Sequence, residues 1–270
     1  MKIFDFNIHL PYLQDKDVNK VIAQDLTLDV EGICKGLEIH KTNIQKAEAA
    51  NFLLFNTKLF DSNVAPFLKT SNQLFEKTTF TALIDFRRSD ILSYVEKIKE
   101  SGVGAIMFNS YLQQISEPDF VEIGKICQFA EKLGLIICID GSYGTSKMYA
   151  YDNLKLACFV ADMVSKVPIV IVHSGGYRII EAFLLADAKP NIWLDTSFSL
   201  PYYIGSSIEQ DFAFVYKKMN ARRIVFGTDY PYANSEAAIE IHQNFFDKHQ
   251  FSAQEQEQIF YQNALELFQI

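Results

Sequence analysis

Arg223-Ile224-Val225-Phe226-Gly227-Thr228-Asp229-Tyr230-Pro231 is the stretch that decides the fold. A β-branched and aromatic run that ends in a glycine, a threonine and an aspartate is typical of a buried parallel strand. Pro231 cannot continue a strand ladder, so Asp229 is left as the last inward side chain at the carboxyl end of the strand. An apolar strand that presents one carboxylate at this end is how α/β barrels present catalytic groups.

The same pattern of apolar strand and polar end occurs along the whole chain. The other predicted strands are residues 3–9, 51–56, 79–86, 102–109, 135–140, 168–173 and 191–195. Helical patterns alternate with them, including one across much of 17–49 and a last one at 253–268, and this alternation predicts parallel strands with right-handed crossovers. Eight units in 270 residues predict a single α/β domain over residues 1–270, a (β/α)₈ TIM barrel. An open nucleotide-binding sheet is the weaker alternative, because no Gly-x-Gly-x-x-Gly turn follows the first strand.

Composition limits the partners of the protein. The net charge of -8 argues against nucleic acid, and the chain has no apolar run of the roughly 18 residues that a membrane span needs. Charged residues interrupt the first apolar run, so it does not resemble a signal peptide. Four cysteines lie singly in apolar contexts, which is typical of reduced thiols. We therefore expect a cytoplasmic protein with a small-molecule substrate and no nucleic-acid or membrane partner.

Polar side chains gather where the predicted strands end. Period-two counting places Asp5, Asn7 and His9 on one face of the first strand. The full set at the strand ends is Asn7, His9, Arg87 or Arg88, Asn109, Asp140, His173 and Asp229. Each residue alone could be structural, since aspartates near turns often accept backbone N–H bonds. Together they would be costly to bury unless they are used, so we predict a site there. The other histidines, His40, His242 and His249, lie in predicted helices and are expected at the surface.

These stretches together resemble the amidohydrolase superfamily, specifically the amidohydrolase-related family that includes aminocarboxymuconate semialdehyde decarboxylase and several lactonases. The motifs that carry the resemblance are Asp5-Phe6-Asn7-Ile8-His9, Gly104-Ala105-Ile106-Met107-Phe108-Asn109, Val170-Ile171-Val172-His173-Ser174-Gly175-Gly176, Gly227-Thr228-Asp229-Tyr230-Pro231, and residues 255–268 around Asn263-Ala264. The resemblance implies a metal-dependent hydrolase or decarboxylase on a TIM barrel. Dimers are common in this family, so a homodimer is an expected assembly.

The sequence departs from the family at its metal ligands. Members that bind a divalent metal typically use a His-x-His pair on strand one, a histidine ending strand five and an aspartate ending strand eight. Here the pair is Asn7-x-His9 and strand five ends in Asp140, while Met107 replaces the lysine that bridges two metals in some members. His9, Asp140 and Asp229 could still hold one divalent ion, either Zn²⁺ or, because two ligands are carboxylates, Mn²⁺ or Mg²⁺. Whether any metal is bound stays open.

Hydrolysis remains feasible without a metal. Asp229 would be the general base on water, with His173 and His9 polarising the carbonyl and protonating the leaving oxygen. Arg87 or Arg88 would clamp a substrate carboxylate. The other predicted pocket residues are Asn7, Asn109, Tyr111, Tyr143 and Ser174.

The sequence thus predicts an amidohydrolase-like hydrolase of a small carboxylated or sugar-derived ester, lactone or amide. One alternative is a non-catalytic, degenerate barrel that binds a ligand or partner, which the loss of two ligand histidines favours. The other alternative is a non-oxidative decarboxylase that uses the same acid/base pair.

Overall fold

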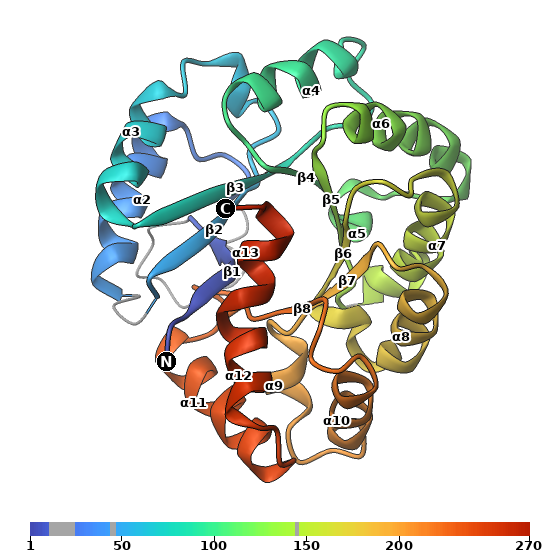
Figure 1. Cartoon of the computed structure of the whole chain (residues 1–270). Coiled ribbons are helices and arrows are strands. Elements are labelled where there is room, and N and C mark those ends of the chain that lie inside the picture. Colours follow the sequence, from blue (N-terminus) through green and yellow to red (C-terminus); the bar gives the residue numbers. More distant parts are fainter. Residues whose placement is uncertain (11–24, 44–46, 144–145) are drawn as a thin grey trace.

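The computed structural model describes residues 1–10, 25–43, 47–143 and 146–270, and Figure 1 shows their arrangement. Eight parallel strands form one sheet, in which each strand pairs with the next along the chain. The strands are β1 (Phe4–His9), β2 (Ala49–Leu54), β3 (Lys77–Leu83), β4 (Ala105–Phe108), β5 (Ile136–Asp140), β6 (Ile169–Val172), β7 (Ile192–Asp195) and β8 (Ile224–Val225).

Backbone hydrogen bonds join the last strand to the first. Phe6 N donates to Phe226 O (2.8 Å), Asp229 N donates to Asn7 O (2.9 Å) and His9 N donates to Tyr230 O (2.8 Å). These bonds close the sheet into a barrel, so the predicted (β/α)₈ TIM barrel is confirmed.

Helices surround the barrel, and their apolar sides pack against the outer face of the strands (Figure 1). They are α2 (Val30–Asn43), α3 (Ala65–Leu74), α4 (Ile91–Glu100), α5 (Ser110–Gln113), α6 (Phe120–Lys132), α7 (Asn153–Met163), α8 (Ile179–Ala188), α9 (Ser199–Tyr203), α10 (Ile208–Lys218), α11 (Ser235–Lys248), α12 (Ala253–Glu257) and α13 (Asn263–Phe268). Of the stretch 17–49, predicted to be mostly helical, residues 17–24 and 44–46 lie outside the described residues. No helix among the described residues is both long and apolar enough to cross a membrane.

The last helix covers the amino end of the barrel. A π-helical turn, Gln258–Gln262, separates α12 from α13 where a single helix was predicted. Phe268 of α13 stacks on Phe4 at the start of β1, with ring centroids 5.9 Å apart. Asn263 donates hydrogen bonds to the carbonyls of Ala221 (2.7 Å) and Ile224 (2.6 Å), which fastens the helix to the start of β8. The opposite, carboxyl end of the barrel is therefore the end available for a site.

A β-bulge in β1 sets the direction of its side chains. Asp5 pairs with Ala50 and Ile8 pairs with Phe52, so β1 takes three steps where β2 takes two. The extra residue reverses the alternation. Phe4 and Phe6, before the shift in register, pack inside the barrel in one buried cluster with Trp193 and Val225. The prediction that Asp5 shares a face with Asn7 and His9 is therefore wrong, because a strict period of two ignores the bulge.

Candidate active site

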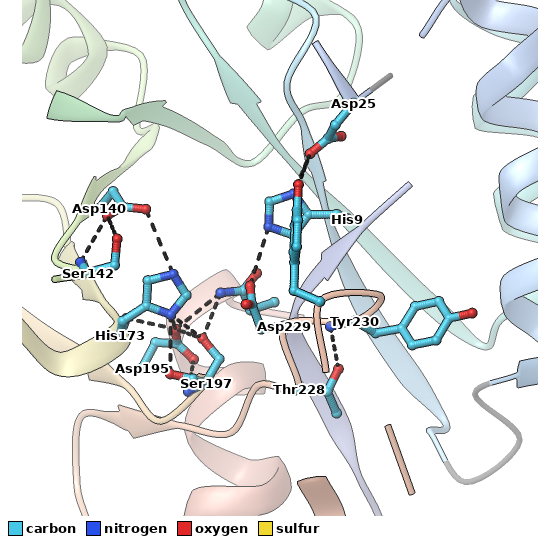
Figure 2. Close-up of polar contacts among 12 residues, drawn as sticks. His9, Asp25, Asp140, Ser142, His173, Asp195, Ser197, Thr228, Asp229 and Tyr230 are labelled. Carbon is cyan, nitrogen blue, oxygen red and sulfur yellow. Dashed lines mark hydrogen bonds and ion pairs between the residues drawn. The ribbon is translucent and has the colours of Figure 1, made fainter. Parts of the chain in front are cut away.

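Five buried polar side chains come together at the carboxyl end of the barrel, each from a strand end or the residues just after it (Figure 2). They are His9, Asp140, His173, Asp195 and Asp229, all at most 6% exposed. Figure 2 shows Asp229 between the two imidazoles. Buried polar groups persist only when they are paired, so the partners of each group define what it can do.

His9 is held between two carboxylates. Its Nδ1 lies 2.6 Å from Asp25 Oδ2, and its Nε2 lies 3.4 Å from Asp229 Oδ1. The rings of Phe55 and Tyr232 meet the imidazole edge-on, with centroids 4.6 Å and 4.8 Å away. The aromatic rings restrict the ring's position while the carboxylates fix its two nitrogens.

His173 lies on a strained turn. Its φ is 61° and that of Ser174 is 53°, in the left-handed region that side chains other than glycine rarely adopt. The imidazole Nδ1 lies 2.9 Å from Ser197 Oγ and 3.2 Å from Ser197 O, while Nε2 lies 3.8 Å from Asp140 Oδ2. Both histidines thus have Nδ1 anchored and Nε2 directed at a carboxylate.

The carboxylates make both imidazoles basic. Burial alone lowers the pKa of His9, but the charge of Asp25 and the hydrogen bond to Asp229 outweigh it and raise the pKa to about 10. Burial also lowers the pKa of His173, but the charges of Asp229, Asp140 and Asp195 outweigh burial, so this pKa lies above its usual value. His9 is consequently an imidazolium, and a proton donor, at neutral pH.

A loop fixed by Asp5 presents Asp229. Asp5 accepts hydrogen bonds from Thr228 N (2.9 Å) and Thr228 Oγ1 (2.6 Å), and Thr228 Oγ1 accepts one from Tyr230 N (3.2 Å). Burial raises the pKa of Asp5 to about 7 despite these bonds. The loop holds Asp229 at a φ of 63°, so its carboxylate position depends on backbone strain.

The predicted metal ligands His9, Asp140 and Asp229 lie at the same end of the barrel but are not arranged to hold a common ion. Asp140 Oδ1 accepts from Ser142 N (2.9 Å) and Ser142 Oγ (2.5 Å), and its Oδ2 accepts from Asn109 Nδ2 (3.0 Å). Across the described ranges, no group of three or more His, Cys, Asp or Glu residues is arranged to hold a metal ion. The donor set that the structure describes therefore does not fit a three-ligand centre, although His9 and Asp229 face each other as two of its members would.

Three further predicted residues lie beside this cluster. Asn7 Nδ2 donates to Ser197 Oγ (2.7 Å) and Asp195 Oδ2 (3.3 Å). Asn109 is the hydrogen-bond donor to Asp140. For Tyr111, burial raises the pKa, and the charges of Asp140, Asp229 and Asp25 raise it further.

The arginines are engaged elsewhere. Arg87 donates to the carbonyl of Gln113 (2.8 Å) and lies over the ring of Phe86. Arg88 forms ion pairs with Asp61 (3.0 Å) and Asp90 (2.9 Å). Neither guanidinium contacts the histidines or aspartates of the site.

Two predicted pocket residues also have other contacts. The hydroxyl of Tyr143 accepts a hydrogen bond from Arg178 and lies 3.4 Å from Asp152. Ser174 is buried, and its Oγ donates to the backbone carbonyl of Asp195 (2.6 Å). Ser174 therefore secures the turn that carries His173.

Sequence reasoning did not include Asp25, Asp195, Ser197 and Tyr232 in the site. Asp195 ends β7 as Asp140 ends β5, so the rule that selected Asp140 could have selected it. For Asp25 no comparable signal exists, because it lies in no strand.

Two histidines expected at the surface are buried. His40 Nε2 contacts the carbonyl of His9, and His242 lies between Ala238 O (2.7 Å) and Thr196 Oγ1 (2.8 Å). Both helices turn these side chains towards the barrel, so the surface prediction is wrong. His249 is only partly buried, where it lies 2.8 Å from Glu209.

Comparisons with known proteins agree with the barrel fold. A family model described as amidohydrolase matches residues 93–270. No curated protein matches the sequence. A solved TIM-barrel protein from Bordetella bronchiseptica shares 17% identity at a TM-score of 0.76, over 99% of this chain and 98% of that one.

Two further solved structures extend over nearly the full length of both chains. A zinc-bound amidohydrolase from Burkholderia multivorans shares 13% identity at a TM-score of 0.69, over 100% of each chain. The 5-carboxyvanillate decarboxylase from Sphingomonas paucimobilis shares 11% identity at a TM-score of 0.66, over 100% of this chain and 99% of that one. At such identities these likenesses establish the barrel fold alone.

Proposed function

The chain belongs to the amidohydrolase family, and from this premise we propose that it hydrolyses a small ester, lactone or amide at the carboxyl end of the barrel. One observation carries the proposal: Asp229 lies between the imidazoles of His9 and His173 (Figure 2). The Nδ1 atom of each ring is held by a hydrogen-bond partner, Asp25 for His9 and Ser197 for His173. A carboxylate beside two oriented imidazoles is a general base beside proton donors.

The chemistry needs only these three side chains and water. Asp229 takes a proton from a water molecule as the water oxygen attacks the carbonyl carbon. The N–H of His9 stabilises the negative charge that develops on the carbonyl oxygen. When the bond from carbon to the leaving oxygen or nitrogen breaks, His173 as the imidazolium donates the proton on its Nε2 to the leaving atom and is left neutral with its proton on Nδ1. The proton that Asp229 took from water then passes through solvent to Nε2 of His173, which restores both groups.

The carboxylate clamp expected from Arg87 or Arg88 is not part of the proposal, because both guanidinium groups are bound to other partners. Tyr111 takes their place as the expected substrate contact, because the charges of the site aspartates contribute to its raised pKa. The amide of Asn7 is buried and already donates to Ser197 and Asp195.

A panel of lactones, esters and amides tests the reaction, with acid release followed in a pH-stat and CO₂ measured in parallel on aromatic carboxylates. Acid release supports the hydrolase. Release of CO₂ alone would make the protein a decarboxylase, and ligand binding without either product would make it a binding barrel.

The variant Asp229→Asn isolates the base. Asparagine tolerates the left-handed backbone at this position, so we expect the melting temperature to stay within about 4 °C of wild type. The rate should fall at least about 100-fold, because the base is lost. Asp187→Asn, the same change at an exposed site, should leave the rate unaltered. Full activity in Asp229→Asn would refute the assignment.

Elemental analysis of protein purified without chelator, together with the His9→Ala variant, addresses the metal. We expect no stoichiometric metal from the donors described above. Near-stoichiometric metal that disappears in His9→Ala would contradict the proposed route and restore His9, Asp140 and Asp229 as ligands.

A further inference from the structure

Asp195 is the centre of a buried network behind His173 (Figure 2). Its Oδ2 accepts hydrogen bonds from the backbone N of His173 (3.0 Å), from Asn7 Nδ2 (3.3 Å) and from Ser197 Oγ. Its Oδ1 accepts a fourth from Ser197 N (3.0 Å). Asp195, Asn7 and Ser197 are all fully buried.

The donors and acceptors of this network determine where its protons lie. An ionised carboxylate only accepts, so the Ser197 hydroxyl donates its one hydrogen to Asp195. Asn7 Nδ2 donates to Ser197 Oγ at 2.7 Å. The Nδ1 of His173 faces Ser197 Oγ at 2.9 Å and the Ser197 carbonyl at 3.2 Å, and neither has a hydrogen left to give it. Nδ1 must therefore carry a proton.

The same carboxylate secures the strained backbone under the ring. Asp195 Oδ2 holds the backbone N of His173, and its own carbonyl accepts from Ser174 Oγ (2.6 Å). His173 and Ser174 both have positive φ, a conformation that persists only where the surroundings fix it. Asp195 thus holds the backbone of His173 directly and orients its imidazole ring through Ser197.

We propose that Asp195, acting through Ser197, is a positioning residue that keeps the proton of neutral His173 on Nδ1 and so directs Nε2 at the reacting atoms. The role rests on the proposed function, in which His173 transfers a proton at Nε2. Asp195 itself does not touch the substrate in this scheme.

Asp195→Ala tests this role. It removes the acceptor of the Ser197 hydroxyl, which is then free to donate to Nδ1 of His173. The proton of the neutral ring should then move to Nε2, and kcat should fall about 10²- to 10⁴-fold with KM little changed. Ring ¹⁵N chemical shifts of labelled histidine, recorded at alkaline pH and assigned with His173→Gln, report which nitrogen carries the proton.

Ser197→Ala provides a second test if Asp195→Ala does not fold. It removes the hydroxyl but leaves the backbone carbonyl, so the two tautomers of His173 should become mixed and kcat should fall about 10- to 100-fold. Ser71→Ala removes another buried hydroxyl, on α3, and should leave the His173 signals unchanged.

Wild-type His173 with its proton on Nε2 would overturn the proposal. So would variants that lose stability but keep the wild-type tautomer and kcat. The tautomer is read without substrate, so a failure of the proposed hydrolase on the panel is distinguishable from a failure of this role.

Discussion

At the scale of single residues, Gly227 decides whether the network behind His173 can form. A Cβ atom at this position would lie 2.6 Å from Asp195 Oδ1, 2.8 Å from Asn7 Cβ and 3.0 Å from Ser197 Cβ. Real side chains do not approach so closely. The missing side chain lets the end of β8 pass directly against the polar groups of β1 and β7.

Gly227→Ala should therefore affect stability and rate together. We expect a loss of about 1–3 kcal/mol in the free energy of unfolding from overpacking, and a fall in kcat because Asp195 and Ser197 must move. Gly104→Ala is the matched control at the other end of the barrel, where the new methyl would meet only the ring of Phe268 at 3.1 Å. Its rate should equal wild type. Denaturant unfolding and steady-state kinetics on both variants check this, and an unaffected rate in Gly227→Ala would contradict it.

Several site residues could be predicted because strand ends are readable. His9, Asp140, His173 and Asp229 each follow an apolar run, and parallel strands bring such positions to one edge. Asp25 could not be found this way, since its position depends on tertiary contact with His9 and on no local pattern. The partners of Arg87 and Arg88 were equally unpredictable, because exposed charges pair with whatever carboxylate the fold places near them.

At the scale of secondary-structure elements, the β-bulge in β1 could not be predicted from the sequence. One extra residue between Asp5 and Ile8 lets Phe6 fill the barrel while Asn7 and His9 still reach the site. A bulge has no signature in hydrophobic alternation. The strands were predicted within a few residues, whereas the helix predicted at 253–268 is divided by the π-helical turn Gln258–Gln262.

The element that closes the amino end should contribute stability and leave the rate unchanged. Asn263→Ala removes both hydrogen bonds to the carbonyls of Ala221 and Ile224. We expect a loss of about 1–3 kcal/mol in the free energy of unfolding, because buried acceptors lose their donor. Thermal unfolding gives the loss and kinetics on folded protein give the rate. A large fall in kcat would show that this end of the barrel influences the site.

At the scale of the whole molecule, two buried histidines couple folding to pH. Burial lowers the pKa of His40 and of His242 to about 4, against an ordinary value of 6.5. The unfolded chain therefore binds more protons than the folded one between these values, so stability falls as the pH drops from about 6.5 towards 4. Each histidine contributes a loss of up to about 3 kcal/mol over that window.

The variant His242→Gln has no titrating group at this position, so it measures the contribution of His242 to the loss of stability at low pH. The free energy of unfolding of the variant should fall less steeply than that of wild type between pH 6.5 and 4. Asp5 has the opposite effect on stability, because burial raises its pKa to about 7 and the folded state then gains stability as the pH falls. The slope of the variant must therefore be compared with the slope of wild type. Parallel curves for variant and wild type would mean that His242 is accessible to protons in the folded state.

The closure of β1 on β8 has a consequence for synthesis on the ribosome. β1 emerges from the exit tunnel before the other strands of the barrel, yet the N–H of Phe6 and the carbonyl of Asn7 are bonded to Phe226 and Asp229, near the end of the barrel sequence. Throughout translation the nascent chain therefore presents an unpaired strand edge, the kind of surface that recruits other chains. The hydrogen bonds that shape the mouth around Asp229 are among the last to form, so an incompletely translated barrel has neither a closed sheet nor a site.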